Sequence, residues 1–168
     1  KKISLKLEID SGVPDEINND SRRLQQVLIN LITNALKFSP KKSEITIGAS
    51  LVNSPLHNPA VRISVKDQGI GIRREHLGLL FQEFGRLNSE ENDRLNPQGV
   101  GLGLWISNNL ASRIGTALEV ASKYGQGSVF SFSVNIDSPP NERSQPPTSN
   151  RRKSNTTQSV SVEIPLTG

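Results

Sequence analysis

The chain contains no cysteine, which excludes a disulfide framework and thiolate metal sites. It also has no secretory signal pattern and no apolar run long enough to cross a membrane, so a soluble, reducing compartment is expected. Aromatic residues make up only 4% of the chain, and the one basic run is the short 151–153. Stacking platforms and a basic face are therefore scarce, and the sequence argues against nucleic-acid binding despite a net charge of +4.

A length of 168 residues is enough for one core of ordinary size. Beyond residue 136 the composition shifts to proline, serine, asparagine, threonine and glutamine, with few large apolar residues. Such a segment cannot bury enough surface to offset its chain entropy. We therefore predict a folded domain over residues 1–136 and a disordered linker or tail over 137–168. Residues 160–164 alternate again, but we favour no strand there.

Hydrophobic periodicity predicts three helices and five strands. One helix begins after the N-cap Asp20 and ends at Ser39, before a proline, and another runs from Leu102 to Gly115. A short helix is expected over 75–84. Strands are predicted over residues 3–9, 44–52, 60–66, 117–122 and 128–135. We expect 44–52 and 60–66 to be adjacent and antiparallel, and the last two strands to form a hairpin. The polar segment 85–98 has no periodicity, which is typical of a mobile loop.

The first helix carries a polar stripe at spacings of three and four residues. An amide oxygen can ligate Mg²⁺, and a lysine can neutralise phosphate oxygens. The same stripe would also suit a solvated helix face, although asparagine is a poor helix former and is repeated here one turn apart. The residues of this stripe are Arg23, Gln26, Asn30, Asn34 and Lys37.

Asp67 follows a predicted strand and precedes Gly69 and Gly71. Asp-x-Gly is ordinary turn chemistry. Alternatively, the carboxylate accepts a hydrogen bond from the exocyclic amino group of a purine, while the glycines let the base lie against the main chain. Such a bond would distinguish adenine, which offers a donor at that edge, from guanine, which offers an acceptor.

A second glycine cluster, at 99, 101 and 103, leads directly into the predicted helix. Free N–H groups at a helix start can hold phosphates. No Gly-Lys-Ser/Thr follows, so the cluster is not a P-loop, and its third glycine falls one residue early for a dinucleotide fingerprint. A helix start packed closely against a sheet remains the alternative.

In their order and spacing these segments resemble the ATP-binding domain of histidine kinases. That domain belongs to a superfamily shared with type II topoisomerases, large ATP-dependent heat-shock chaperones and mismatch-repair proteins. Residues 24–38 resemble the family's N box, 67–71 its G1 box, 80–84 its F box and 99–104 its G2 box. The match covers residues 1 to about 136.

The resemblance implies an α/β (α+β) two-layer sandwich, the Bergerat-type ATP-binding fold. Its sheet would be mixed and mostly antiparallel, with helices on one face and ATP held between the helices under a lid. The lid would be residues 85–98. ATP and Mg²⁺ are the implied cofactors.

The resemblance also assigns roles within the site. Asn34 would ligate Mg²⁺, Asn30 would support the phosphate end, Lys37 would contact phosphate and Asp67 would bind the adenine amino group. Phe81 and Phe84 would anchor the lid or, as we prefer, pack in the core. The glycines at 99, 101 and 103 would hinge the lid. The remaining residues expected at the nucleotide are Phe38, Gly69, Gly71, Ile72, Gly99, Val100, Gly101, Leu102 and Gly103.

Hydrolytic members of the superfamily carry a glutamate where this chain has Asn30. An amide cannot act as a general base. Water is therefore a poor candidate nucleophile, and phosphoryl transfer with Asn30 and Lys37 as catalytic candidates is favoured over ATP hydrolysis. A nucleotide-gated conformational ATPase and a degenerate, non-binding interaction module are the competing hypotheses.

The phosphoacceptor is not evident in the chain. In the family it lies on a separate dimerisation domain with a His-Glu/Asp signature, and neither His57 nor His76 has that context. We therefore expect a dimerisation and phosphoacceptor domain as a partner, and a receiver domain or response regulator as a further one. No nucleic acid and no direct membrane contact are expected. The expected location is cytoplasmic, including the cytoplasmic part of a membrane-bound kinase.

Overall fold

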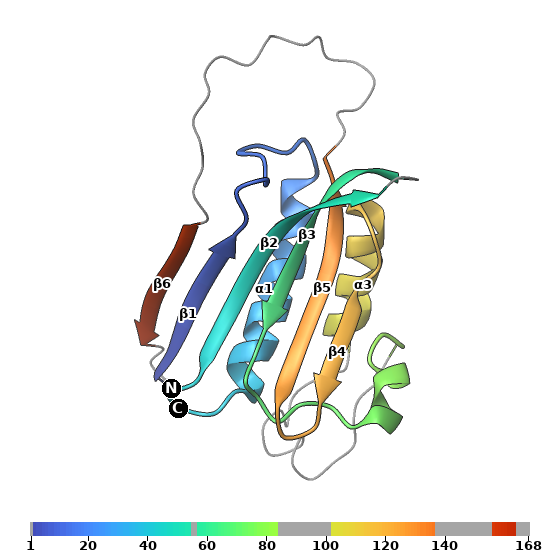
Figure 1. The fold of residues 1–168 in the computed structure, drawn as a ribbon. Coiled ribbons are helices and arrows are strands. Elements are labelled where there is room, and N and C mark those ends of the chain that lie inside the picture. Colours follow the sequence, from blue (N-terminus) through green and yellow to red (C-terminus); the bar gives the residue numbers. More distant parts are fainter. Residues whose placement is uncertain (1, 55–56, 84–101, 137–155, 164–168) are drawn as a thin grey trace, which may run out of the picture.

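The computed structural model describes residues 2–54, 57–83, 102–136 and 156–163, which form one sheet with helices on one face (Figure 1). The order of the strands across the sheet is β4-β5-β3-β2-β1-β6. The strands are β1 (Lys2–Ile9), β2 (Glu44–Ser54), β3 (His57–Lys66), β4 (Glu119–Lys123), β5 (Gly127–Asn135) and β6 (Thr156–Glu163).

Strand directions confirm the predicted mixed, mostly antiparallel sheet. Only β1 and β2 run parallel, and every other neighbouring pair is antiparallel. The antiparallel neighbours β2 and β3 and the β4–β5 hairpin were both expected from the sequence. The alternation of apolar and polar residues that predicted these strands is seen in the structure. Along β3, Val61, Ile63 and Val65 are buried, while Arg62 is exposed.

Two helices, α1 (Ser21–Phe38) and α3 (Gly103–Ile114), lie on the same face of the sheet. The side chain of Asp20 caps α1 by accepting the Arg23 backbone N–H at 3.0 Å, and the helix ends at Ser39 as predicted. Gly115 ends α3. The apolar stripes of both helices meet the inward residues of the strands, and the largest fully buried side chains of this core are Phe132, Leu31, Ile45, Val27, Val65 and Val134.

The predicted helix over 75–84 is shorter and tighter than expected. It is the 3-10 helix η1 (Arg74–Leu79), in which His76 N–H bonds the Arg73 carbonyl and Leu80 N–H bonds the Leu77 carbonyl. Gly78 lies inside this stretch and weakens helix formation. Phe81 packs against the core, as preferred above. Phe84 and the predicted mobile segment 85–98 lie outside the described residues.

The prediction that the tail contains no strand is wrong for residues 156–163. These residues form β6, which pairs antiparallel with β1 along its whole length, from Lys2 opposite Glu163 to Ile9 opposite Thr156. A sheet edge distant in sequence supplies the hydrogen-bonding partners, and local composition cannot reveal such a partner. Residues 137–155 and 164–168 lie outside the described residues.

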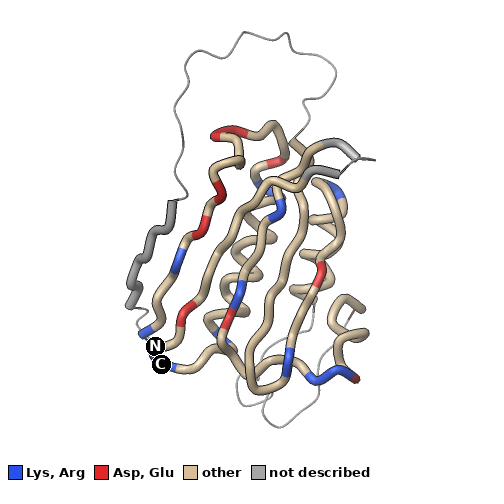
Figure 2. Tube along the Cα trace, viewed as in Figure 1, with Lys and Arg blue, Asp and Glu red and all other residues tan. Residues whose placement is uncertain are grey.

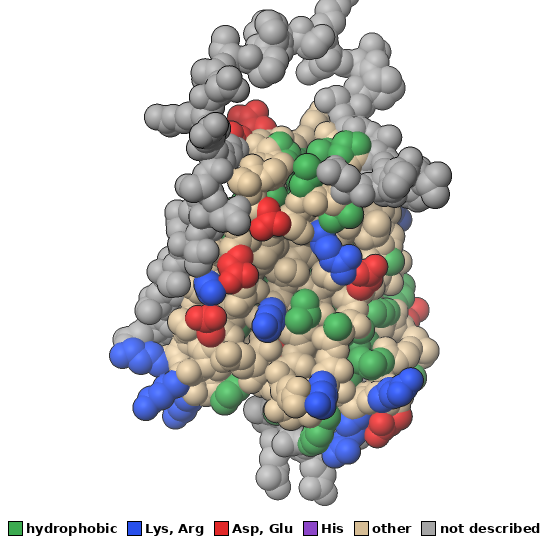
Figure 3. All heavy atoms as spheres, viewed as in Figure 1, with side chains coloured by type: hydrophobic (Ala, Val, Ile, Leu, Met, Phe, Trp, Pro, Cys, Tyr) green, Lys and Arg blue, Asp and Glu red, His purple; other side chains and the backbone are tan. Residues whose placement is uncertain are grey.

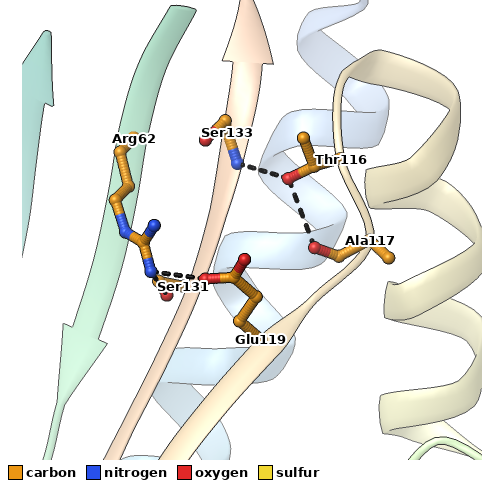
Figure 4. Close-up of polar contacts among 6 residues, drawn as sticks. All are labelled: Arg62, Thr116, Ala117, Glu119, Ser131 and Ser133. Carbon is orange, nitrogen blue, oxygen red and sulfur yellow. Dashed lines mark hydrogen bonds and ion pairs between the residues drawn. The ribbon is translucent and has the colours of Figure 1, made fainter. Parts of the chain in front are cut away.

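The face of the sheet away from the helices carries many charged side chains. Basic and acidic residues are interspersed along the strands (Figure 2), and Figure 3 shows side chains of both signs on this face beside scattered hydrophobic ones. Arg62 on β3 forms an ion pair with Glu119 on β4 and donates to the Ser131 hydroxyl on β5 at 2.8 Å (Figure 4). Both partners of the ion pair are exposed, so the pair contributes about 0–1 kcal/mol to stability.

Candidate nucleotide-binding site

Asp67 lies directly after β3, where the alternation of the strand turns its side chain towards the helix-covered face. Only 7% of the residue is exposed. Its Oδ1 accepts the backbone N–H groups of Gly69 at 2.7 Å and Ser128 at 3.2 Å. The Asp67 backbone N–H in turn donates to the Ser128 carbonyl at 2.8 Å. The main chain thus fixes the orientation of the carboxylate, and Oδ2 takes no part in these bonds.

Burial raises the pKa of Asp67 above its ordinary value of 3.8, and the two backbone N–H donors oppose this effect. A carboxylate in such a place is poorly solvated, so a hydrogen bond from a ligand would be stronger than in water. This environment suits an acceptor that selects one donor group.

The glycines beside Asp67 are required by neighbouring backbone. Gly71 has φ +67°, and a Cβ there would lie 2.1 Å from the Lys123 carbonyl oxygen. A Cβ on Gly69 would lie 2.7 Å from the Phe38 carbonyl oxygen. The sequence predicted that these glycines let a base lie against the main chain; in the structure, the space that a Cβ would need at each of them is taken by neighbouring backbone. Residues 67–71 are therefore held between the end of α1 and the β4–β5 turn.

The β4–β5 turn holds the next residues as well. Gly125 N–H donates to the Ile70 carbonyl at 2.7 Å, and Ile72 N–H donates to the Ser122 hydroxyl at 2.8 Å. The Arg73 guanidinium stacks over the Tyr124 ring, 4.1 Å from its centroid. Ile72 itself is half-buried and packs against the core.

Along α1, Asn30, Asn34 and Phe38 share one face because they are spaced by four residues. Asn30 Nδ2 donates to the buried Ser107 hydroxyl of α3 at 2.8 Å, and a Cβ on Gly103 would lie 2.7 Å from Asn30 Oδ1. At the other end of the face, the Phe38 carbonyl contacts Gly69. From Asn30 to Phe38 is about 12 Å along the axis, and Asn34 lies between them, half-buried.

The structure thus brings together residues from three separate predicted motifs. Asn30 meets Gly103, and Phe38 meets Gly69 and hence Asp67. Lys37 lies in the last turn of α1, and Leu102 directly precedes α3 as its N-cap. Gly99, Val100 and Gly101 lie outside the described residues.

Sequence reasoning missed Ser107. It is 1% exposed and shares the buried face of α3 with Ala111 and Ile114. A small polar residue at a core position of an otherwise apolar helical stripe was the available signal, because a buried hydroxyl needs a hydrogen-bonding partner.

The fold is that of the ATPase domains of histidine kinases. The profile of the family described as "Histidine kinase-, DNA gyrase B-, and HSP90-like ATPase" matches residues 19–138, and the chain belongs to this family.

Relatives with named functions agree with this assignment. The chain is 37% identical over 134 residues to hybrid signal transduction histidine kinase B of Dictyostelium discoideum, covering 80% of the chain and 7% of that protein. It is 36% identical over 143 residues to the signal transduction histidine-protein kinase BarA of Escherichia coli K12, covering 84% of the chain and 15% of that protein. The chain therefore spans a small part of the length of these relatives.

Solved structures show the same fold. Full-length ShkA in complex with AMPPNP matches with a TM-score of 0.66 and 30% identity, over 82% of this chain and 26% of that one. The mycobacterial sensor histidine kinase MprB matches with a TM-score of 0.62 and 23% identity, over 79% of this chain and 80% of that one, which supports the fold alone. In the described residues, no helix is long and apolar enough to span a membrane.

Proposed function

We propose that this chain binds Mg-ATP along the face of α1 and donates the γ-phosphoryl group to a histidine on a separate dimerisation domain. The observation that carries the proposal is the placement of three features along one helix. The buried Asp67 carboxylate lies beyond the end of α1, the Asn30–Ser107 contact with α3 lies further back, and Asn34 lies between. A nucleotide lying along this face would have its base at Asp67 and its phosphates at Asn30, Asn34 and Lys37.

The donor set fits magnesium rather than a metal held by protein alone. Among the described residues no group of three or more His, Cys, Asp or Glu side chains could hold a metal ion. Mg²⁺ commonly keeps several waters and shares its remaining positions with few protein oxygens and with substrate phosphates. The amide oxygen of Asn34 would supply a protein ligand of that kind, and the bound ion would neutralise phosphate charge.

Asn30 favours phosphoryl transfer over hydrolysis. Its amide donates to Ser107 and has no basic group that could take a proton from water. The chain would then act by holding the phosphates in line with an incoming imidazole and by neutralising them with Lys37. The chain spans a small part of the length of its relatives. We therefore also propose that it works with a separate acceptor domain and with a receiver domain or response regulator, in the cytoplasm.

The experiment is a calorimetric titration with a non-hydrolysable ATP analogue, with and without Mg²⁺. We expect Mg²⁺ to increase the affinity of the wild type for the analogue. In Asn34→Ala this increase should be smaller by a factor of about ten or more, which corresponds to about 1.4 kcal/mol. The matched control is Thr33→Ala, because the exposed Thr33 hydroxyl donates to carbonyls of α1 itself.

Unchanged Mg²⁺ dependence in Asn34→Ala would reject Asn34 as the ligand. Absence of nucleotide binding in the wild type would reject the proposed function and favour an interaction module. ATP hydrolysis by the chain alone would favour a conformational ATPase instead.

A further inference from the structure

The backbone of β1 has two different edges. Ser4 N–H donates to the Ser43 carbonyl and Asp10 N–H donates to the Ala49 carbonyl, each at 3.0 Å, so the even-numbered residues bond towards β2. Backbone polar groups of successive strand residues point to opposite sides in the plane of the sheet. The odd-numbered residues of β1 therefore direct their N–H and C=O groups to the outer edge.

β6 lies on that outer edge in a register that matches these groups. The odd-numbered residues of β1 stand opposite even-numbered residues of β6: Leu5 opposite Val160 and Leu7 opposite Gln158. In an antiparallel ladder such pairs exchange both hydrogen bonds. It follows that the N–H groups of Gln158 and Val160 point to β1, whereas those of Ser159 and Ser161 point away from the sheet.

β6 is joined to the domain through little else. Its one extensive contact within the described residues is with β1. Its sequence, TTQSVSVE, holds two apolar residues, and its backbone pairs with β1 along the whole strand. The net gain from the hydrogen bonds of such a ladder is small and comparable to the entropy cost of ordering the strand.

The length of the intervening chain also suits a strand that docks from a tether. The span from β5 to β6 across β3, β2 and β1 is about 19 Å at ordinary strand spacing. Fully extended, the chain between Ile136 and Thr156 would reach about 65 Å. A tether longer than its span lets the strand leave and return, at an effective concentration in the millimolar range.

We propose that the outer edge of β1 is a strand-docking surface, which this chain occupies reversibly with its own residues 156–163. Recognition is through the backbone in the antiparallel register that β6 adopts. An added peptide of the same sequence would therefore take the place of β6 once that strand is displaced.

The first test places proline on either side of β6 in the full chain. Gln158→Pro removes an N–H that points to β1, and Ser159→Pro removes one that points away from β1, so the first variant alone deletes a ladder bond. Amide hydrogen exchange is measured residue by residue. We expect Gln158→Pro to speed exchange about tenfold or more at Leu5 and Leu7, with Ser4 and α1 unchanged, and Ser159→Pro to have little effect.

The second test adds a synthetic peptide of residues 155–164 to each full-length variant. Gln158→Pro should bind it about tenfold or more tightly than Ser159→Pro does, because in the latter the edge is already filled. N-methylation of the peptide at Gln158 and Val160 should abolish binding, and N-methylation at Ser159 and Ser161 should preserve it.

Three outcomes would overturn the proposal. Equal exchange at Leu5 and Leu7 in the two proline variants would show that the docked strand does not protect this edge. A Gln158→Pro chain with unchanged exchange in α1 but no peptide binding would show that the vacated edge does not accept a strand. A concentration-dependent dimer of the wild type that disappears in Gln158→Pro would assign the edge to a second copy of the chain.

Discussion

The two ends of the candidate site are built in different ways. At the Asp67 end, backbone packs directly on backbone: Gly71 lies against the Lys123 carbonyl and Gly127 against the Asp67 carbonyl. At the other end, one side-chain hydrogen bond, from Asn30 to Ser107, joins α1 to α3. Backbone packing in left-handed glycine conformations has few alternatives, whereas a side-chain bond between two helices can be replaced by a ligand.

This difference indicates how the site would work. The end proposed for the base is preformed, because its carboxylate is oriented before any ligand arrives. The end proposed for the phosphates can reorganise, because Asn30 can exchange its bond to Ser107 for one to a ligand at a cost of about 1 kcal/mol. Substitutions at both ends test this contrast, from the largest expected effect to the smallest.

Gly127→Ala should destabilise the fold more than any of the substitutions that follow. Gly127 has φ +99°, and a Cβ there would lie 2.1 Å from the Asp67 carbonyl oxygen, so the backbone must shift. We expect a loss of about 3 kcal/mol or more in the free energy of unfolding, measured by chemical denaturation. Gly125→Ala is the control in the same turn: its φ is +79° but nothing lies within 4 Å, so about 1 kcal/mol is expected. Equal losses would disprove backbone packing as the cause.

Asp67→Asn should weaken binding of the ATP analogue and remove the preference for adenine over guanine. The lost hydrogen bond to a charged acceptor is worth about 1.5–3 kcal/mol, or roughly 10- to 150-fold in affinity. Titration with ATP and GTP analogues measures both quantities. Because an asparagine oxygen can still accept from Gly69 and Ser128, the fold should survive. Unchanged affinity would remove Asp67 from the site.

The same substitution should affect stability in the opposite direction. Because burial raises the pKa of Asp67 above 3.8, the folded chain binds this proton more tightly than the unfolded chain does. The Asp67 contribution is therefore most favourable at low pH and is lost as the pH rises from 3.8 through the folded pKa. At pH 7 Asp67→Asn should melt at a higher temperature than the wild type, and the difference should disappear in acid. A lower melting temperature at pH 7 would contradict the inferred cost of burying the charge.

The Asn30–Ser107 bond should show a smaller energy. A double-mutant cycle with Asn30→Ala and Ser107→Ala is expected to give a coupling of about 0.5–1.5 kcal/mol in the unfolding free energy. Repeating the cycle with saturating nucleotide should reduce this coupling if Asn30 turns to the phosphates. Ser112→Ala is the control on α3, since its exposed hydroxyl donates to the Asn108 carbonyl of the same helix. A coupling that persists undiminished with nucleotide would show that this end is as rigid as the other.

Much of this molecule could be predicted from local sequence signals. The limits of α1 followed from Asp20 and Ser39, and the directions of two strand pairs, β2–β3 and β4–β5, followed from alternation and the short loops between them. These signals act within a few residues, so a sequence carries them explicitly. The order of the motifs then sufficed to indicate the family.

Features that depend on distant partners could not be predicted in the same way. The need for glycine at position 71 comes from the Lys123 carbonyl, and the bond of Asn30 comes from Ser107, far along the chain. β6 is the extreme case, because residues 156–163 form a strand only where the open edge of β1 meets them. The composition of that segment predicts disorder when the segment is taken alone, whereas pairing with β1 gives it a strand conformation.

The register of β6 also has a mechanical consequence. Lys2 stands opposite Glu163, so the chain enters β1 and leaves β6 at the same corner of the sheet (Figure 1). A pull applied between those two connections would load the bonds of this pair one after another, as in a zipper, rather than all at once in shear. Relative movement of whatever is attached there would therefore peel this strand away at low force and leave the other five in place.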